Sequence, residues 1–231
     1  MESEDYFKKE NLFTGKNVVV TGASGEIGCL VVESLMKCGA KVIAVGRNEK
    51  KIFDKFSKYS KSKNQNFGYE LIDLEDPQGI TRGFKSILMK LKGRLDILIL
   101  CHGQFKVGRL IDTAVDVFDS TLHVNVRACF HLISMASPFL KLSKGNVVAV
   151  SSLESKIPVR DGFLNSVSKA MLNSLIECSA LELSSFGVRV NAVAPGITAT
   201  SHRVTEDFLD RENKDYLEKM GGFFLLNKEV V

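Results

Sequence analysis

Six short apolar runs, separated by stretches with helical hydrophobic spacing, constrain the fold of this chain more than any other feature. Each run is apolar throughout instead of alternating with polar residues, which is typical of strands buried on both faces. Two buried faces require helices on both sides, so the order predicts an α/β fold with a doubly wound parallel sheet. The expected strands are Asn17–Val20, Val42–Val45, Phe67–Ile72, Asp96–Cys101, Asn146–Val150 and Val188–Val193.

Helices are expected between these strands. The first starts near Ile27 and stops at Gly39, and a lysine-rich one follows Arg47. The others are expected from Pro77 to about Leu91, over Thr113–Leu122, over Val124–Leu142, and along a stripe of Val167, Met171, Leu175 and Cys178.

Length and composition indicate one globular domain, with residues 1–15 as an N-terminal extension. The chain has 231 residues, of which 45% are hydrophobic and 25% charged. No apolar run reaches the roughly 20 residues of a membrane span, and the acidic start lacks the features of a secretory signal. We therefore expect a cytoplasmic protein without a membrane span.

The charge, the cysteines and the histidines give no indication of a nucleic-acid partner, a disulfide framework or a metal site. A net charge of +4 without a clustered basic patch does not indicate a nucleic-acid partner. The five cysteines are odd in number and contain no CxxC pair, so buried, reduced thiols are expected. The four histidines form no cluster with cysteines or carboxylates, and no metal site is expected.

A glycine-rich turn, Thr21–Gly28, joins the first strand to the first helix. A turn of this kind lets the backbone approach a pyrophosphate, which the helix N-terminus then stabilises. The same turn begins a series of motifs. From Lys16 to Thr200, the chain resembles the short-chain dehydrogenase/reductase family, whose members have a Rossmann-type fold. Thr21–Gly28 matches the family's TGxxxGxG motif, and Asp73 matches the acidic residue beside the adenine. Asp96–Gly103 stands in the place of the segment that carries NNAG. The PGxxxT motif is matched by Pro195, Gly196 and Thr200.

The resemblance also assigns site residues. It implies an active-site tetrad at Asn125, Ser152, Lys169 and the position of Asn165. It implies NADP(H) as the cofactor, because Arg47 ends the second strand where a basic residue pairs with the 2′-phosphate; a solvated arginine is the equal alternative. The implied cofactor-binding residues are Thr21, Gly22, Ser24, Ile27, Gly28, Arg47, Asp73, Leu74, Gly103, Lys169, Pro195, Gly196, Thr198 and Thr200.

The chain departs from the family pattern at the tetrad itself. The family's tyrosine should stand four residues before Lys169, and that residue is Asn165. The spacing from Ser152 to Asn165 is the one that the resemblance leads us to expect, so the register is sound. The tyrosine is the general acid and base, whereas a carboxamide cannot ionise. Such catalysis contributes roughly 10²–10⁴-fold to the rate.

Two other departures lie in the cofactor motifs. Glu26 replaces a glycine of TGxxxGxG, and a carboxylate about 4 Å from a phosphate costs on the order of 1–4 kcal/mol. Gly25 could take over the missing role in a shifted turn. The NNAG motif reads Leu100-Cys101-His102-Gly103, so only its glycine remains.

These departures favour a pseudoenzyme, a non-catalytic family member that serves as a binding or structural subunit. The alternative is an NADP(H)-dependent oxidoreductase that reduces a carbonyl or oxidises an alcohol. It would use Ser152 and Lys169 without the tyrosine, with His102 or water as the acid. Each of these residues also has a competing structural interpretation. Ser152 could cap a turn, Lys169 could be an ordinary helix lysine, and Asn125 could have a structural role.

The resemblance implies an oligomer as well. Family members commonly pair through the helices after the fourth and fifth strands, here Val124–Leu142 and Ser166–Leu183. A homodimer or a place in a larger assembly is expected. The resemblance implies that residues 197–231 hold the substrate-loop region and a truncated C-terminal part, without the further helix and seventh strand that are usual in the family. Either the sequence is truncated or something else finishes the sheet edge, and an uncovered edge strand would be a site for a partner.

Overall fold

The computed structural model describes residues 11–61 and 66–196. The chain divides into one unit up to Ala194 and a second from Pro195 onward, of which only Pro195 and Gly196 are described. The account below concerns the first unit. The expectation of a single domain stays a prediction.

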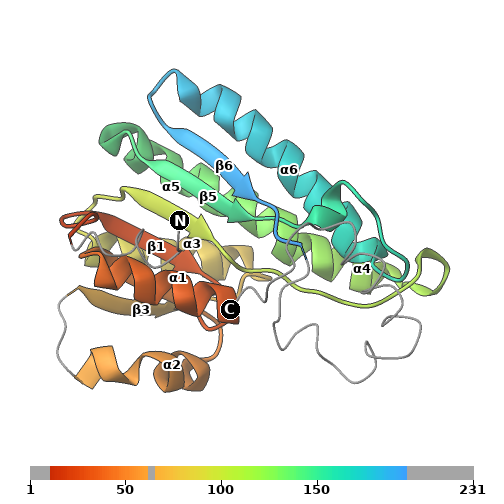
Figure 1. Cartoon of the computed structure of the whole chain (residues 1–231), viewed down its shortest axis with the longest axis horizontal. Coiled ribbons are helices and arrows are strands. Elements are labelled where there is room, and N and C mark those ends of the chain that lie inside the picture. The colour runs from red at the N-terminus through yellow and green to blue at the C-terminus, as the bar shows by residue number, and fades with distance from the viewer. Residues whose placement is uncertain (1–10, 62–65, 197–231) are drawn as a thin grey trace, which may run out of the picture. The chain divides into compact units, whose positions relative to one another are not determined.

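The first unit holds a six-stranded parallel sheet in the order β3-β2-β1-β4-β5-β6 (Figure 1). The order reverses between β1 and β4, as in doubly wound sheets. All six expected strands and the Rossmann-type fold are confirmed. The strands are β1 (Asn17–Thr21), β2 (Lys41–Gly46), β3 (Phe67–Leu71), β4 (Ile97–Leu100), β5 (Asn146–Val150) and β6 (Arg189–Val193).

Helices follow the strands, with two differences from expectation. The expected helix over Val124–Leu142 starts later, because a π-turn, η3 (His123–Arg127), joins it to the preceding helix. The expected helix over Thr113–Leu122 starts at Val115. The helices are α1 (Glu26–Lys37), α2 (Glu49–Lys61), α3 (Pro77–Lys90), α4 (Val115–Leu122), α5 (Ala128–Ser143) and α6 (Phe163–Ser184), with short 3₁₀ turns η2 (Leu110–Asp112) and η4 (Leu153–Ser155).

Two hydrophobic cores lie on opposite faces of the sheet, which explains why the strands are apolar throughout. In β1, Val19 points into one core while Val18 and Val20 point into the other, as the pleat requires. The first core packs against α3, α5 and α6, and the second against α1 and α2.

The stripe expected along α6 is only partly covered by the core, against which Leu175 packs. Met171 and Cys178 are exposed, whereas Leu172, Ile176 and Leu183 are buried in the core. Apolar residues lie on both faces of this helix, so hydrophobic spacing alone could not identify the core side. The expectation of buried thiols is wrong for Cys178, which is exposed. It is confirmed for Cys29, Cys38 and Cys129, which are buried.

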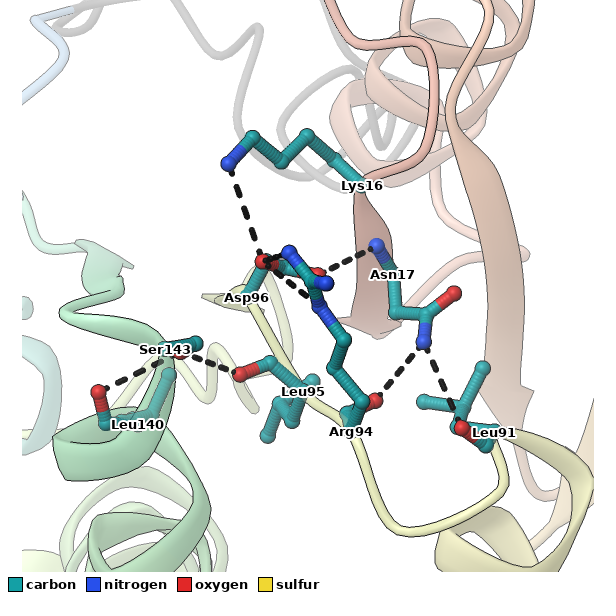
Figure 2. Close-up of polar contacts among 8 residues, drawn as sticks. All are labelled: Lys16, Asn17, Leu91, Arg94, Leu95, Asp96, Leu140 and Ser143. Carbon is teal, nitrogen blue, oxygen red and sulfur yellow. Dashed lines mark hydrogen bonds and ion pairs between the residues drawn. The ribbon is translucent and has the colours of Figure 1, made fainter.

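A buried carboxylate joins the starts of β1 and β4 (Figure 2). Asp96 accepts the backbone N–H of Asn17 at 2.9 Å and is bound by the Arg94 guanidinium at 2.8–3.2 Å, with Lys16 at 3.7 Å. Burial acts to raise the pKa of Asp96, but the hydrogen bonds from Arg94 and Asn17 outweigh it, and the pKa lies below its usual value. The carboxylate is thus held ionised where the two central strands begin.

We expect Asp96→Ala to lower the free energy of unfolding by about 2–3 kcal/mol, because it removes a charged acceptor from a buried backbone N–H. Urea unfolding followed by circular dichroism measures this loss. The control is Asp112→Ala, which removes an ion pair to Arg109 between two exposed side chains and should change stability little. Equal effects of the two substitutions would contradict a special role for Asp96.

Candidate functional site

The β1–α1 turn is built around close backbone contacts at the carboxyl end of the sheet. Gly22 has a φ of +63°, and a Cβ there would lie 2.6 Å from the backbone N of His102. A Cβ on Gly28 would lie 2.3 Å from the carbonyl oxygen of Gly22. The two glycines thus let the turn pack against the loop after β4 and against the first turn of α1.

This turn fits the phosphate-binding role that its motif implies. Gly25 is the N-cap of α1, and no side chain caps the helix. The first N–H groups of α1 therefore have no side-chain acceptor at the cap and can face an anion. Ser24 and Ile27 are half-buried in the same turn, and the Oγ of Ser24 lies 3.5 Å from the Cβ position of Gly46 at the end of β2. Glu26, also half-buried, is the first residue of α1, so its negative charge is part of this turn.

The structure places the other implied cofactor residues in three ways. Arg47 and Asp73 are exposed just beyond the ends of β2 and β3, and Asp73 accepts the backbone N–H of Glu75 at 3.0 Å. Leu74 packs against the core. Pro195 and Gly196 belong to the second unit, and Thr198 and Thr200 lie outside the described residues.

Asn125 holds the loop after β4 from its position in the π-turn. Its Oδ1 accepts the backbone N–H of Gln104 at 2.7 Å, and its Nδ2 donates to the carbonyl of Gln104 and to the Oγ of Ser168, each at 3.0 Å. The side chain is fully buried. These bonds use both N–H donors of the amide and tie the loop after β4, η3 and α6 together.

Lys169 lies beside that loop. Its Nζ donates to the carbonyl of Val150 at 2.7 Å, and burial lowers the pKa of this lysine. A Cβ on Gly103 would lie 3.4 Å from this Nζ and 3.5 Å from the Oδ1 of Asn125. The structure therefore brings Gly103, Asn125 and Lys169 together.

Ser152 and Asn165 meet through a residue that the sequence analysis missed, Glu154. The Oγ of Ser152 accepts the backbone N–H of Glu154 at 3.2 Å and caps η4. The Nδ2 of Asn165 donates to the Oε2 of Glu154 at 2.6 Å. Glu154 is only 8% exposed and Asn165 only 5%, so a buried carboxyl group lies beside the position where the resemblance leads us to expect a tyrosine. No motif marks Glu154; only its place two residues after Ser152 could have drawn attention to it.

His102 is enclosed between β1 and α5. Its Nδ1 lies 2.6 Å from the Oγ1 of Thr21, and its Nε2 lies 3.3 Å from the Sγ of Cys129. Burial, aided by the nearby Lys169 charge, lowers the pKa of His102 to about 3. Burial also raises the pKa of Cys129 to about 12, so a neutral imidazole contacts a neutral thiol. This arrangement makes His102 a packing residue and opposes its use as a substitute acid.

Residues 11–61 and 66–196 contain neither a metal-binding cluster nor a membrane-spanning helix. No three or more histidine, cysteine, aspartate or glutamate side chains there are placed to bind a metal ion together. Nor does any helix in those residues have the length and apolar character needed to cross a membrane.

Comparisons with known proteins show what this chain is similar to. A family model described as short chain dehydrogenase matches residues 16–208. A tropinone reductase homolog of Arabidopsis thaliana is 32% identical over 186 residues, which cover 80% of this chain and 70% of that protein. An uncharacterized oxidoreductase of Staphylococcus epidermidis is 26% identical over 198 residues, covering 85% of this chain and 84% of that protein.

Solved structures show the same fold. A short-chain dehydrogenase/reductase of unknown function from Caenorhabditis elegans, solved with cofactor, has a TM-score of 0.77 and 25% identity over 91% of this chain and 80% of that one. L-Sorbose reductase from Gluconobacter frateurii, complexed with NADPH and L-sorbose, has a TM-score of 0.82. It is 22% identical over 93% of this chain and 83% of that one, and this likeness concerns the fold alone.

The enclosed His102 should make the protein sensitive to mild acid. The unfolded chain takes up a proton at His102 near pH 6.5, whereas the folded chain takes it up only near pH 3. Stability is therefore lost as the pH falls through this window, by up to about 1.4 kcal/mol per pH unit from this residue. Urea unfolding at several pH values should give a shallower slope for His102→Asn. Equal slopes for the two proteins would show that His102 titrates normally in the folded state.

Proposed function

The chain belongs to the short-chain dehydrogenase family, and we propose that it binds NADP(H) without interconverting carbonyls and alcohols, as a cytoplasmic binding or structural subunit. The observation that carries this proposal is the hydrogen bond from Asn165 to Glu154. Asn165 stands at the position from which the family's tyrosine exchanges a proton with the substrate. Its side chain is an amide, which does not ionise.

Cofactor binding is supported by the form of the turn. Gly22, Gly28 and the N-terminus of α1 would hold the pyrophosphate, and Arg47 would pair with the 2′-phosphate. When bound, the dinucleotide supplies or accepts a hydride. Glu26 would oppose the phosphates electrostatically and cost roughly one to three decades of affinity. We therefore propose weak but saturable binding with a preference for the phosphorylated cofactor.

The proposed loss of carbonyl chemistry is attributed to position 165, while the other three tetrad residues hold the site around it. Asn125 is used in the loop contacts, Ser152 caps η4, and Lys169 donates to a backbone carbonyl. Asn165 can hydrogen-bond but cannot release or take up a proton. Without that exchange, the alkoxide formed by hydride addition to a carbonyl has no acid at position 165.

A second function is favoured by the place of Lys169. This lysine remains buried beside Gly103 and Asn125, as a working site would require. An NADP(H)-dependent oxidoreductase that uses Ser152 and Lys169 with a water molecule as the acid is therefore the second candidate.

Pairing with another copy is proposed through α5 and α6. Both helices carry large exposed apolar side chains, which are costly to leave in water when they form a contiguous surface. They are Phe130 (57% exposed) on α5, and Met171 (44%) and Leu181 (78%) on α6. A homodimer, or a place in a larger assembly, would cover these side chains.

Asn165→Tyr should create carbonyl reductase activity, because it restores an ionisable hydroxyl four residues before Lys169. We expect oxidation of NADPH by a panel of ketones and aldehydes to rise by about 10²–10⁴-fold over the unmodified protein. The variant Asn165→Tyr/Glu154→Ala gives the larger side chain more room. Spectrophotometric loss of NADPH is the readout.

The matched control is Asn165→Tyr with Lys169→Ala, which should stay inactive because the lysine supports the hydroxyl. Rapid carbonyl turnover by the unmodified chain would contradict the proposed function. It would favour the second candidate.

A further inference from the structure

We propose that Glu75 is a positioning residue for the cofactor, which fixes the loop at the adenine end of the site against the loop after β4. Glu75 lies two residues after Asp73, the residue implied to stand beside the adenine. The inference rests on the proposed function, because it concerns the NADP(H) that the chain is proposed to bind. It is carried by four hydrogen bonds at a residue that no motif of the sequence marks.

The loop after β3 cannot be joined to the loop after β4 by strand pairing. β3 is an edge strand, and β2 and β1 lie between it and β4. At roughly 4.8 Å per strand, the ends of β3 and β4 are about 14 Å apart. Side chains must therefore hold the two loops together at this edge of the sheet.

The carboxylate of Glu75 makes this connection. Its Oε1 accepts a hydrogen bond from the Nε2 of Gln104 at 2.6 Å and another from the Oγ of Ser120 at 3.1 Å. Gln104 follows Gly103 in the loop after β4, and Ser120 lies on α4. Hydrogen bonds to an ionised carboxylate are charge-assisted and stronger than bonds between neutral groups. One side chain thus ties the loop after β3 to two elements that follow β4.

The main chain of Glu75 is held as well. Its N–H donates to the Oδ1 of Asp73 at 3.0 Å, and its carbonyl accepts the Nη2 of Arg127 at 2.5 Å. Arg127 and Asn125 both belong to the π-turn η3, and Asn125 holds the backbone of Gln104 through bonds of 2.7 and 3.0 Å. The π-turn therefore holds both loops, and the bond between Glu75 and Gln104 closes the set.

This closed set of bonds orders the adenine end before a ligand arrives. The N–H of Glu75 sets the orientation of the Asp73 carboxylate. A loop that is already ordered loses less conformational entropy on binding, so its affinity for the ligand is higher. Without the Glu75 carboxylate, the cofactor itself would have to order this loop. The loss would fall on the adenine half of the dinucleotide and not on the turn built around Gly22 and Gly28.

Titration of the full chain with NADPH, followed by NADPH fluorescence, tests the proposal. We expect Glu75→Ala to raise the dissociation constant of NADPH about tenfold, the effect of one lost hydrogen bond to a charged group. Glu75→Gln should restore most of the affinity, because its amide oxygen still accepts from Gln104 and Ser120. Adenosine 2′,5′-bisphosphate, which contains only the adenine half and competes with NADPH, should lose affinity for Glu75→Ala by the same factor.

Glu70→Ala is the matched control. The Oε2 of Glu70 also accepts a serine hydroxyl, from Ser86 at 2.8 Å, and the Nζ of Lys90 at 2.6 Å, but both donors lie on α3. Its loss should leave the dissociation constant of NADPH unchanged, even where it lowers the melting temperature. Should Glu75→Ala not fold, Gln104→Ala removes the same hydrogen bond from the other side and must give the same loss of affinity.

Unchanged NADPH affinity in Glu75→Ala, or an equal loss in Glu70→Ala, would overturn the inference and leave the proposed function standing. A Glu75→Gln variant as weak as Glu75→Ala would do the same, as would a loss for NADPH that adenosine 2′,5′-bisphosphate does not share. No saturable binding of NADPH by the unmodified chain would refute the proposed function, and the inference would fall with it.

Discussion

The contact between Gly22 and the backbone of Cys101 and His102 sets the geometry on which the site depends. A side chain at position 22 would overlap this backbone, so the turn after β1 and the loop after β4 can approach only through a glycine. That approach places His102 against Thr21 and Cys129. The loop then continues through Gly103 to Gln104, which the Asn125 amide holds in place. The cofactor turn and the tetrad are thereby parts of one packed structure.

Under the proposed function, the chemistry of the site differs from that of the family within this frame. The sheet order, the glycine-rich turn and the buried Lys169 follow the family pattern, whereas Asn165 donates a hydrogen bond to the buried Glu154. Replacing an ionisable phenol by an amide removes proton transfer but keeps hydrogen bonding. One fold can host different chemistries in this way, because function depends on the residues of the site and not on the fold itself.

The sequence predicted the sheet well because burial on both faces demands unbroken apolar runs, and Val18, Val19 and Val20 show the two faces directly. It failed on part of the stripe along α6, because Met171 and Cys178 lie where the core does not cover it. His102 could be named as a loop residue, but its low pKa depends on burial by α5, a contact distant in sequence. Glu154 had no signal, since its role arises only when η4 packs against α6.

Addition of NADPH to the unmodified protein, followed by an excess of mixed carbonyl compounds, tests the central claim most directly. Bound NADPH is followed by its fluorescence, which reports first its binding and then its oxidation. The account predicts saturable binding, weaker with NADH, and no oxidation of the bound cofactor by carbonyls. Carbonyl-dependent oxidation that Lys169→Ala abolishes would contradict it, because position 165 would then not be needed for proton transfer.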